Sequence, residues 1–239
     1  MGRLRIDLNA DLGEEITDDE ALLAVVTSAN VACGYHAGGR EVMRVVCAEA
    51  ARLGVVLGAQ VSYDDRENFG RVEQEVPYAV LREQVADQVG ELVEVAAAEG
   101  TSVQYVKPHG ALYHRVLDDE EQARAVLDGS GVLPVLGMPG ELLRLATDAG
   151  RAVFREGFPD RGYAEDGRLL PRTEPGALVE DHDGVVAQAL ALAARVDSVC
   201  LHGDTPGAVA HAVAVRASLE AAGFELLPFT GPFTGPFTG

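Results

Sequence analysis

Short runs rich in Val, Leu and Ala alternate with longer segments of helical periodicity along most of the chain. The short runs predict strands at about 4–10, 28–33, 55–60, 102–107, 132–136, 152–156 and 197–202. The segments between them predict helices at about 18–26, 39–53, 77–99, 118–128, 139–149, 183–195 and 206–222. Strands and helices that alternate in this way are typical of repeated βα units around a parallel sheet.

This repetition favours one closed barrel over an open doubly wound sheet. An open sheet usually carries a phosphate loop after its first strand, and the chain contains neither G-x-x-x-x-G-K-[ST] nor G-x-G-x-x-G. We therefore predict a single α/β barrel domain of about seven parallel strands over residues 1–227. Residues 228–239 repeat Pro-Phe-Thr-Gly three times, and we predict that they form a flexible tail outside the domain.

Two predicted connections are long for such a fold, at about 60–76 and 157–182. Long loops in compact domains are usually functional or disordered. These two contain Arg, Tyr and Phe rather than Ser and Gly. We therefore predict that both cover a functional site as lids.

The first predicted strand has polar side chains at alternate positions, Asp7, Asn9 and Asp11. Side chains two apart in a strand point the same way, and burying unpaired charge is costly. The pattern predicts one wall of a polar site, with a solvated edge strand as the alternative. A calcium loop is excluded, because Leu12 and Asp18 occupy the positions at which that loop needs Gly and Glu.

The net charge of −19 disfavours nucleic acid or an anionic membrane as a partner. No apolar run approaches the ~20 residues of a membrane helix, and the first residues lack an apolar signal core, so we expect a cytoplasmic protein. Cys33, Cys47 and Cys200 match no zinc or redox spacing. We expect all three to be reduced and mostly buried.

Three histidines, His36, His109 and His202, stand at or just past the end of a predicted strand, each with a nearby glycine. In a parallel barrel these ends meet on one face, where such folds keep their active sites. One such histidine would more often be structural, but three together favour a site. Lys107 could neutralise an anion there or pair with a carboxylate of the first strand. Asp204 reads as an ordinary helix start beside His202.

Six motifs, in order along the chain, resemble the LamB/YcsF family. They are D-L-N-A-D-L-G-E at 7–14, N-V-A-C-G-Y-H-A-G at 30–38, S-Y with F-G-R at 62–71, V-K-P-H-G-A-L-Y at 106–113, E-G-F with D-R and Y at 156–163, and H-G-D-T-P-G-A-V at 202–209. The resemblance runs from residue 4 to about 223.

The resemblance implies a barrel similar to that of polysaccharide deacetylases. It also implies one component of a 5-oxoprolinase, which works with the B and C subunits to open 5-oxoproline to glutamate. ATP is the implied co-substrate, together with Mg²⁺. The site residues that it implies fall into a catalytic and a binding group. The catalytic group is Asp11, His36, Lys107 and His109, and the group that binds substrate or nucleotide is Asp7, Asn9, Arg71, Tyr113, Arg161, His202 and Asp204.

Opening a lactam needs a base for water, positive charge for the developing oxyanion and phosphate, and an acid for the ring nitrogen. We expect Asp11 or His36 as the base, Lys107 as the charge and His109 as the acid. The chain departs from the family at Gln60 and Val61, where many members have His-Pro. An amide cannot act as an acid or base, so any role of that family histidine does not transfer to Gln60.

Two other functions remain open. An Asp with two His is a usable set of ligands for a divalent metal, so a metal-dependent hydrolase of the deacetylase type is one alternative. A non-catalytic subunit that binds a small acid is the other. The sequence alone leaves the presence of a metal undecided.

Overall fold

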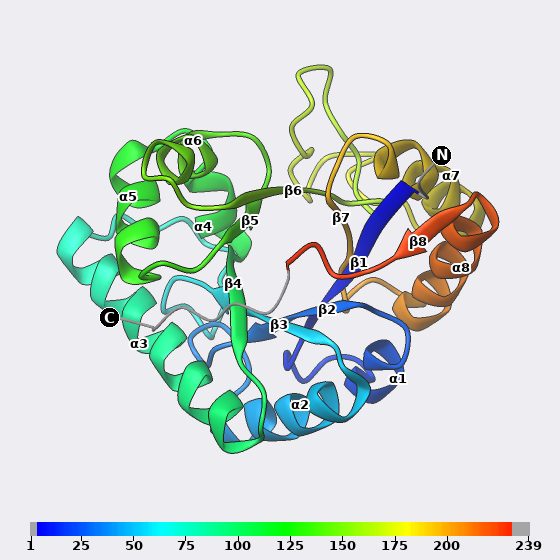
Figure 1. The fold of residues 1–239 in the computed structure, drawn as a ribbon. Coiled ribbons are helices and arrows are strands. Elements are labelled where there is room, and N and C mark those ends of the chain that lie inside the picture. Colours follow the sequence, from blue (N-terminus) through cyan, green and yellow to red (C-terminus); the bar gives the residue numbers. More distant parts are fainter. Residues whose placement is uncertain (1–3, 231–239) are drawn as a thin grey trace.

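Seven parallel strands close into a barrel in the computed structural model, which describes residues 4–230 (Figure 1). They are β1 (Leu4–Leu12), β2 (Ser28–Ala32), β3 (Val56–Val61), β4 (Val103–Pro108), β5 (Val135–Gly137), β6 (Val153–Gly157) and β7 (Ser198–Leu201). Each pairs with the next along the chain, and β1 closes the ring by pairing with both β2 and β7. The prediction of a single α/β barrel is confirmed.

Helices cover the outside of the barrel (Figure 1). They are α1 (Asp19–Leu23), α2 (Arg40–Leu53), α3 (Tyr78–Ala98), α5 (Glu120–Gly129), α6 (Glu141–Asp148), α7 (His182–Ala193) and α8 (Ala208–Ala221). Asp18, Asp119 and Asp181 cap three of these helices by accepting backbone N–H bonds in the first turn. The sequence pattern does not predict two short elements, α4 (Gly110–Arg115) and β8 (Phe224–Leu226), of which β8 pairs with the first residues of β1.

Strand β1 shows how the barrel divides its side chains. Leu8, Ala10 and Leu12 belong to the apolar core, and the residues that alternate with them point into the barrel. Asp7 and Asn9 are fully buried there. The polar face of β1 is therefore enclosed rather than solvated, and the alternative of a solvated edge strand is wrong.

Hydrogen bonds join the buried polar residues around Asp7 and Asn9 inside the barrel. Thr27 and Ser28 each donate to Asp7 Oδ1 at 2.6 Å, and Ser198 donates to the other carboxylate oxygen. Asn30 donates to Asn9 at 2.6 Å. These bonds offset most of the cost of burying the polar groups. Burial nevertheless raises the pKa of Asp7 to about 6.

Tyr105 lies inside the barrel because Gly58 on the neighbouring strand leaves room for it. A Cβ atom at Gly58 would lie 2.1 Å from the Tyr105 ring. Phe229 packs against Tyr105 and Phe154, with ring centroids 4.8 Å and 4.7 Å away. Residues 228–230 thus pack against the barrel, although we predicted them outside it. The rest of the predicted tail, 231–239, lies outside the described residues.

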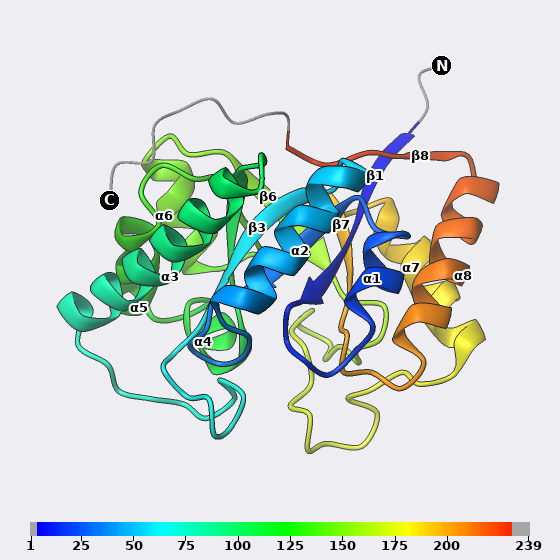
Figure 2. The same cartoon turned by 90° about the horizontal axis from the view of Figure 1, so that it is seen from below.

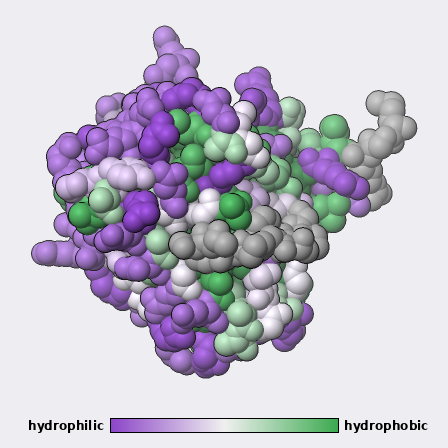
Figure 3. All heavy atoms as spheres, turned by 60° about the vertical axis from the view of Figure 1, so that its left-hand side comes forward, coloured by the Kyte–Doolittle hydropathy of each residue, from purple (hydrophilic) through white to green (hydrophobic). Residues whose placement is uncertain are grey.

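Both predicted long connections are present, between β3 and α3 and between β6 and α7. Figure 2 shows them on the same side of the molecule, opposite β8. Since the barrel strands are parallel, this side is the carboxyl-terminal end of the barrel. On the face drawn in Figure 3, the surface is largely hydrophilic, and hydrophobic residues form small separate groups.

The three cysteines are free and buried, as predicted. Within residues 4–230, no helix combines the length and the apolar character needed to cross a bilayer.

Candidate active site at the carboxyl ends of the strands

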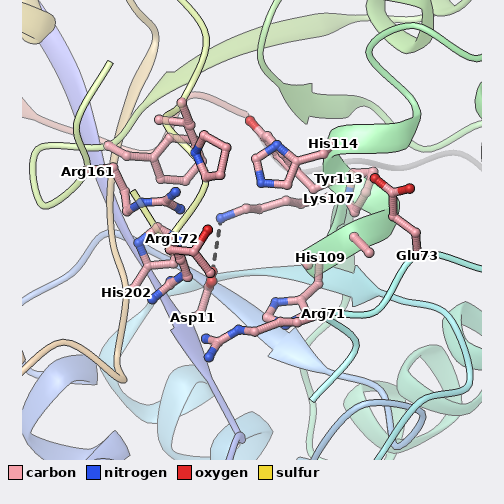
Figure 4. Close-up of a pocket in the computed structure, with 17 residues that line it drawn as sticks. Asp11, Arg71, Glu73, Lys107, His109, Tyr113, His114, Arg161, Arg172 and His202 are labelled. Atoms are coloured by element: carbon pink, nitrogen blue, oxygen red, sulfur yellow. Dashed lines mark hydrogen bonds and ion pairs between the residues drawn. The ribbon is translucent and has the colours of Figure 1, made fainter. Parts of the chain in front are cut away.

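A cavity of about 640 Å³ opens at the carboxyl-terminal end of the barrel (Figure 4). Its wall combines the ends of β1, β4 and β7 with α4 and both long loops. The polar residues of the wall are Asp11, Arg71, Glu73, Lys107, His109, Tyr113, His114, Arg161, Arg172, Thr173 and His202. The prediction that the two long loops cover a site at this end agrees with their place in the wall.

Lys107 lies at the bottom of the cavity between two carboxylates. Its Nζ is 3.0 Å from Asp11 Oδ1 and 3.1 Å from Glu156 Oε2, and it also donates to Cys200 Sγ at 3.1 Å. All four side chains are almost completely buried. One cation therefore serves two acidic groups in a region of low dielectric constant.

The two carboxylates respond differently to this environment. Burial acts to raise the pKa of Asp11, but the charges of Lys107 and His202 outweigh it and lower the pKa below the ordinary value. Burial also raises the pKa of Glu156, and there the Lys107 charge does not overcome it. Asp11 therefore stays ionised more readily. Its Oδ2 atom accepts no hydrogen bond from residues 4–230, so this oxygen is available to a ligand.

Asp160 and His202 form a second acid–base pair beside Lys107. His202 Nδ1 lies 3.0 Å from Asp160 Oδ2, and the Thr205 hydroxyl donates to the same carboxylate at 2.9 Å. Burial acts to raise the pKa of Asp160, but His202 and these hydrogen bonds lower it to about 2. An ionised Asp160 fixes the proton on Nδ1 and leaves Nε2 of His202 free to exchange a proton.

The rim of the cavity carries arginines. Arg71 and Arg172 both pair with Asp204 Oδ2, at 2.5 Å and 3.3 Å. Burial acts to raise the pKa of Asp204, but the two arginines lower it. Arg161 lies deeper, with only 3% of its surface exposed. Within residues 4–230, the wall therefore combines Lys107 and three arginines with Asp11 and Glu73.

A third cluster lies behind the wall and contains Glu14, His36, Gln60 and His109. The imidazole rings of His36 and His109 stack with centroids 4.0 Å apart. His109 has both nitrogens occupied, since Nδ1 lies 3.0 Å from Gln60 Nε2 and Nε2 lies 3.1 Å from the Phe69 carbonyl oxygen. Burial holds the pKa of His109 well below its ordinary value. His109 is therefore a neutral residue with no free nitrogen.

The same cluster is the one place in residues 4–230 with three suitably placed metal ligands. Glu14 Oε1 is 3.6 Å from both His36 Nε2 and His109 Nδ1, close to the about 3.4 Å expected between ligands of a tetrahedral zinc ion. However, the amide nitrogen of Gln60 contacts Glu14 Oε1 at 3.1 Å, and the two rings are nearly parallel, at 13°. Their in-plane lone pairs therefore do not meet at one point. In this arrangement the residues do not fit a metal ion.

The structure brings most of the predicted site residues to one cavity. Those in the wall are Asp11, Arg71, Lys107, His109, Tyr113, Arg161 and His202, with Asp204 just behind the two rim arginines. Asp7 and Asn9 do not reach the cavity, because they lie lower on β1 than Asp11 and bond to other barrel residues. His36 does not reach it either, because the ring of His109 covers it.

Sequence reasoning missed six residues of the site or its support: Glu14, Glu73, His114, Glu156, Asp160 and Arg172. A signal existed for Glu156, which ends the predicted strand 152–156 as Lys107 ends another. Glu14 and Asp160 lie within the family motifs at 7–14 and 156–163. The other three lie in loops or in the unpredicted α4, where no periodicity indicates which way a side chain points.

The chain is similar to known proteins in sequence and in fold. The family model described as LamB/YcsF family matches residues 6–233. The chain is 54% identical to the A subunit of 5-oxoprolinase from Streptomyces avermitilis, over 94% of this chain and 99% of that protein. It is 46% identical to the corresponding 5-oxoprolinase component of Mycobacterium avium, over 94% and 98%.

Among solved structures, the lactam utilization protein of Thermus thermophilus superposes with a TM-score of 0.86 at 33% identity, covering 93% of this chain and 99% of that one. The catalytic domain of a peptidoglycan N-acetylglucosamine deacetylase from Eubacterium rectale shares the fold alone, with a TM-score of 0.56 at 12% identity over 100% and 95% of the chains. The family match and the similarity in fold show that the chain belongs to the LamB/YcsF family.

Proposed function

We propose that the chain is the A subunit of an ATP-hydrolysing 5-oxoprolinase, which opens 5-oxo-L-proline to L-glutamate together with the B and C subunits. In this proposal ATP, with Mg²⁺, is the co-substrate. The observation that supports it best is the convergence of Asp11, Lys107 and His202 on one cavity. The names of the relatives support the same reaction.

Asp11 acts as the base for water in this proposal. Its Oδ1 is held by Asn30 at 2.9 Å and by Lys107 at 3.0 Å. Those two bonds orient the carboxylate and leave Oδ2 for a water molecule. His36, the other candidate base in the sequence, lies behind the cavity wall and cannot contact the same water.

His202 replaces His109 as the proposed acid. His109 has no free nitrogen, whereas the Nε2 atom of His202 has no hydrogen-bond partner among residues 4–230 and His202 lies in the cavity wall. The carboxylate of Asp160 stabilises the protonated imidazole, as a carboxylate does for a catalytic histidine generally. His202 also stacks on Phe158, with centroids 5.1 Å apart, which fixes its ring plane.

Lys107 supplies positive charge next to the reacting carbon. The lactam oxygen takes the γ-phosphoryl group of ATP, and ADP leaves. Water then bonds to the activated carbon and gives its proton to Asp11. His202 protonates the ring nitrogen while the carbon–nitrogen bond breaks, which leaves γ-glutamyl phosphate. A second water hydrolyses this acyl phosphate to glutamate and phosphate.

Reconstitution tests the proposal. The purified chain is mixed with its partner subunits, each component is omitted in turn, and glutamate and phosphate are followed. We expect both products in equal amounts, and only from the complete mixture. Lactam hydrolysis by this chain alone, without ATP, would contradict the shared reaction.

The two other functions predict different results. A non-catalytic acid-binding subunit would leave the complex active after substitution of both Asp11 and His202 by Asn. A metal-dependent deacetylase would need a stoichiometric ion for turnover, which the cluster of Glu14, His36 and His109 does not fit in its present geometry.

A further inference from the structure

All but one of the lysine and arginine side chains in the described wall of the cavity form an ion pair with a carboxylate. Lys107 is matched by Asp11 and Glu156, and Arg71 and Arg172 share Asp204. Among residues 4–230, Arg161 forms no ion pair with a carboxylate. Burying a charge without an opposite charge beside it is costly. A buried guanidinium that faces a cavity and has no ion pair with a carboxylate is therefore suited to bind a negatively charged ligand.

Two backbone carbonyls hold the Arg161 guanidinium in place. Its Nε donates to Ala177 O at 3.1 Å and its Nη2 donates to Leu170 O at 2.7 Å. The backbone of Arg161 is fixed as well, because Gln188 donates to its carbonyl at 2.6 Å. The side chain is thus preorganised before any ligand arrives, and little rotamer freedom remains to be lost.

The free edge of this guanidinium faces the cavity. A guanidinium has five N–H groups, of which the two carbonyls use two. The Nη1 atom has no hydrogen-bond partner in the described part of the chain, and Figure 4 shows the group directed into the cavity near His202 and Arg172. Nη1 and Nη2 together can bind both oxygens of a carboxylate in the planar arrangement that Arg favours.

We infer that Arg161 binds the ring carboxylate of the substrate and makes the site selective for lactams that carry one. This inference rests on the proposed function. Arg161 is 3% exposed, whereas the side chains of Arg71 and Arg172 at the rim are 37% and 28% exposed. A small planar carboxylate fits the single enclosed guanidinium, while a triphosphate needs the wider rim.

The charge of Arg161 persists at neutral pH. Burial lowers the pKa of Arg161 to about 10, and the nearby Arg172 contributes in the same direction, while Asp160 opposes it only in part. The group therefore remains cationic under ordinary conditions, and binding an anion would relieve the repulsion between the two arginines.

The experiment measures binding of three ligands to the full chain by calorimetry: 5-oxo-L-proline, 2-pyrrolidinone, which lacks the carboxylate, and ATP. The variants are Arg161→Gln, Arg161→Lys and the control Arg168→Gln. Arg168 is on the same loop but pairs with Asp118 at the surface. We expect Arg161→Gln to weaken 5-oxoproline binding roughly 10- to 100-fold, and Arg161→Lys to fall between it and the wild type.

The affinity for 2-pyrrolidinone is expected to stay the same in every variant. The ratio of the two lactam affinities within one variant does not depend on how much of the protein is folded. An equal loss for both lactams, or no loss, would overturn the inference and leave the proposed function standing. A loss of ATP affinity alone would reassign Arg161 to a phosphate. If the wild type and the assembled enzyme bind neither lactam, the proposed function fails together with the inference.

Discussion

The interior of the barrel and the cavity above it are built from the same strands, but they shift the pKa of a buried carboxyl group in opposite directions. Asp7, in the interior, is surrounded by hydroxyl donors, and burial raises its pKa to about 6. Asp160, at the cavity, is equally buried, but His202 and its hydrogen bonds lower its pKa to about 2. Hydroxyl groups hold the carboxylate in the interior of the barrel, whereas a histidine holds the carboxylate at its mouth.

Strand β1 shows the same contrast within one element. Asp7 has both oxygens bonded, while Asp11, further along the strand, keeps Oδ2 free and pairs with a lysine. A short length of one strand thus separates a structural carboxylate from one suited to catalysis. The difference comes from position relative to the cavity and not from residue type.

The largest expected effect separates these two carboxylates in the assembled enzyme. Asp11→Asn is expected to lower kcat per folded molecule roughly 1,000-fold, because the base for water is lost. Asp7→Asn is the matched control, the same substitution on the same strand. Its kcat per folded molecule is expected to remain near that of the wild type. Equal kcat values for the two variants, from glutamate and phosphate release, would contradict the assignment of Asp11 as the base.

Removing the lysine should destabilise the cavity side of the molecule. Lys107→Met leaves Asp11 and Glu156 buried without their cation, which is expected to cost about 3–5 kcal/mol in the free energy of unfolding. Urea denaturation at pH 7 measures this. The cost should shrink at lower pH as the two carboxylates become protonated. A loss that is constant with pH would mean that packing, and not charge, dominates.

The pH dependence of stability probes the interior. Because the pKa of Asp7 is raised from 3.8 to about 6, the folded state binds the proton more tightly than the unfolded chain does. The free energy of unfolding from this group therefore falls as the pH rises from about 4 to 6, by about 3 kcal/mol. Denaturation of wild type and Asp7→Asn across that range isolates the contribution. Parallel curves would show that Asp7 is not the group responsible.

The smallest effect concerns the amino-terminal end of the barrel. Phe229 contacts Tyr105 and Phe154 and is only partly buried, so Phe229→Ala is expected to cost about 1–2 kcal/mol. Thermal unfolding should register a drop of a few degrees in Tm, with lactam binding unchanged. An unchanged Tm would favour the predicted boundary at residue 227.

The fold was predictable because its signals are periodic. Most barrel strands coincide with a short run rich in Val, Leu and Ala, helical periodicity follows between them, and the number of such units favours a closed barrel. Convergence of Asp11, Lys107 and His202 was predictable for the same reason, since strand ends of a parallel barrel share one face.

The roles of individual residues were not predictable in this way. His36 and His109 both follow strand ends, but stacking buries one behind the other, and only the folded structure shows that Gln60 and Phe69 occupy both nitrogens of His109. Asp160 comes from an irregular loop. Its hydrogen bond with His202 depends on how that loop folds against the end of β7.

The decisive measurement is a crystal structure of the chain with 5-oxo-L-proline bound. We predict that the lactam carbonyl carbon lies between Asp11 Oδ2 and His202 Nε2, with its oxygen toward Lys107. A lactam bound outside this cavity, or one whose carbonyl faces away from Asp11, would contradict the proposed roles of these three residues.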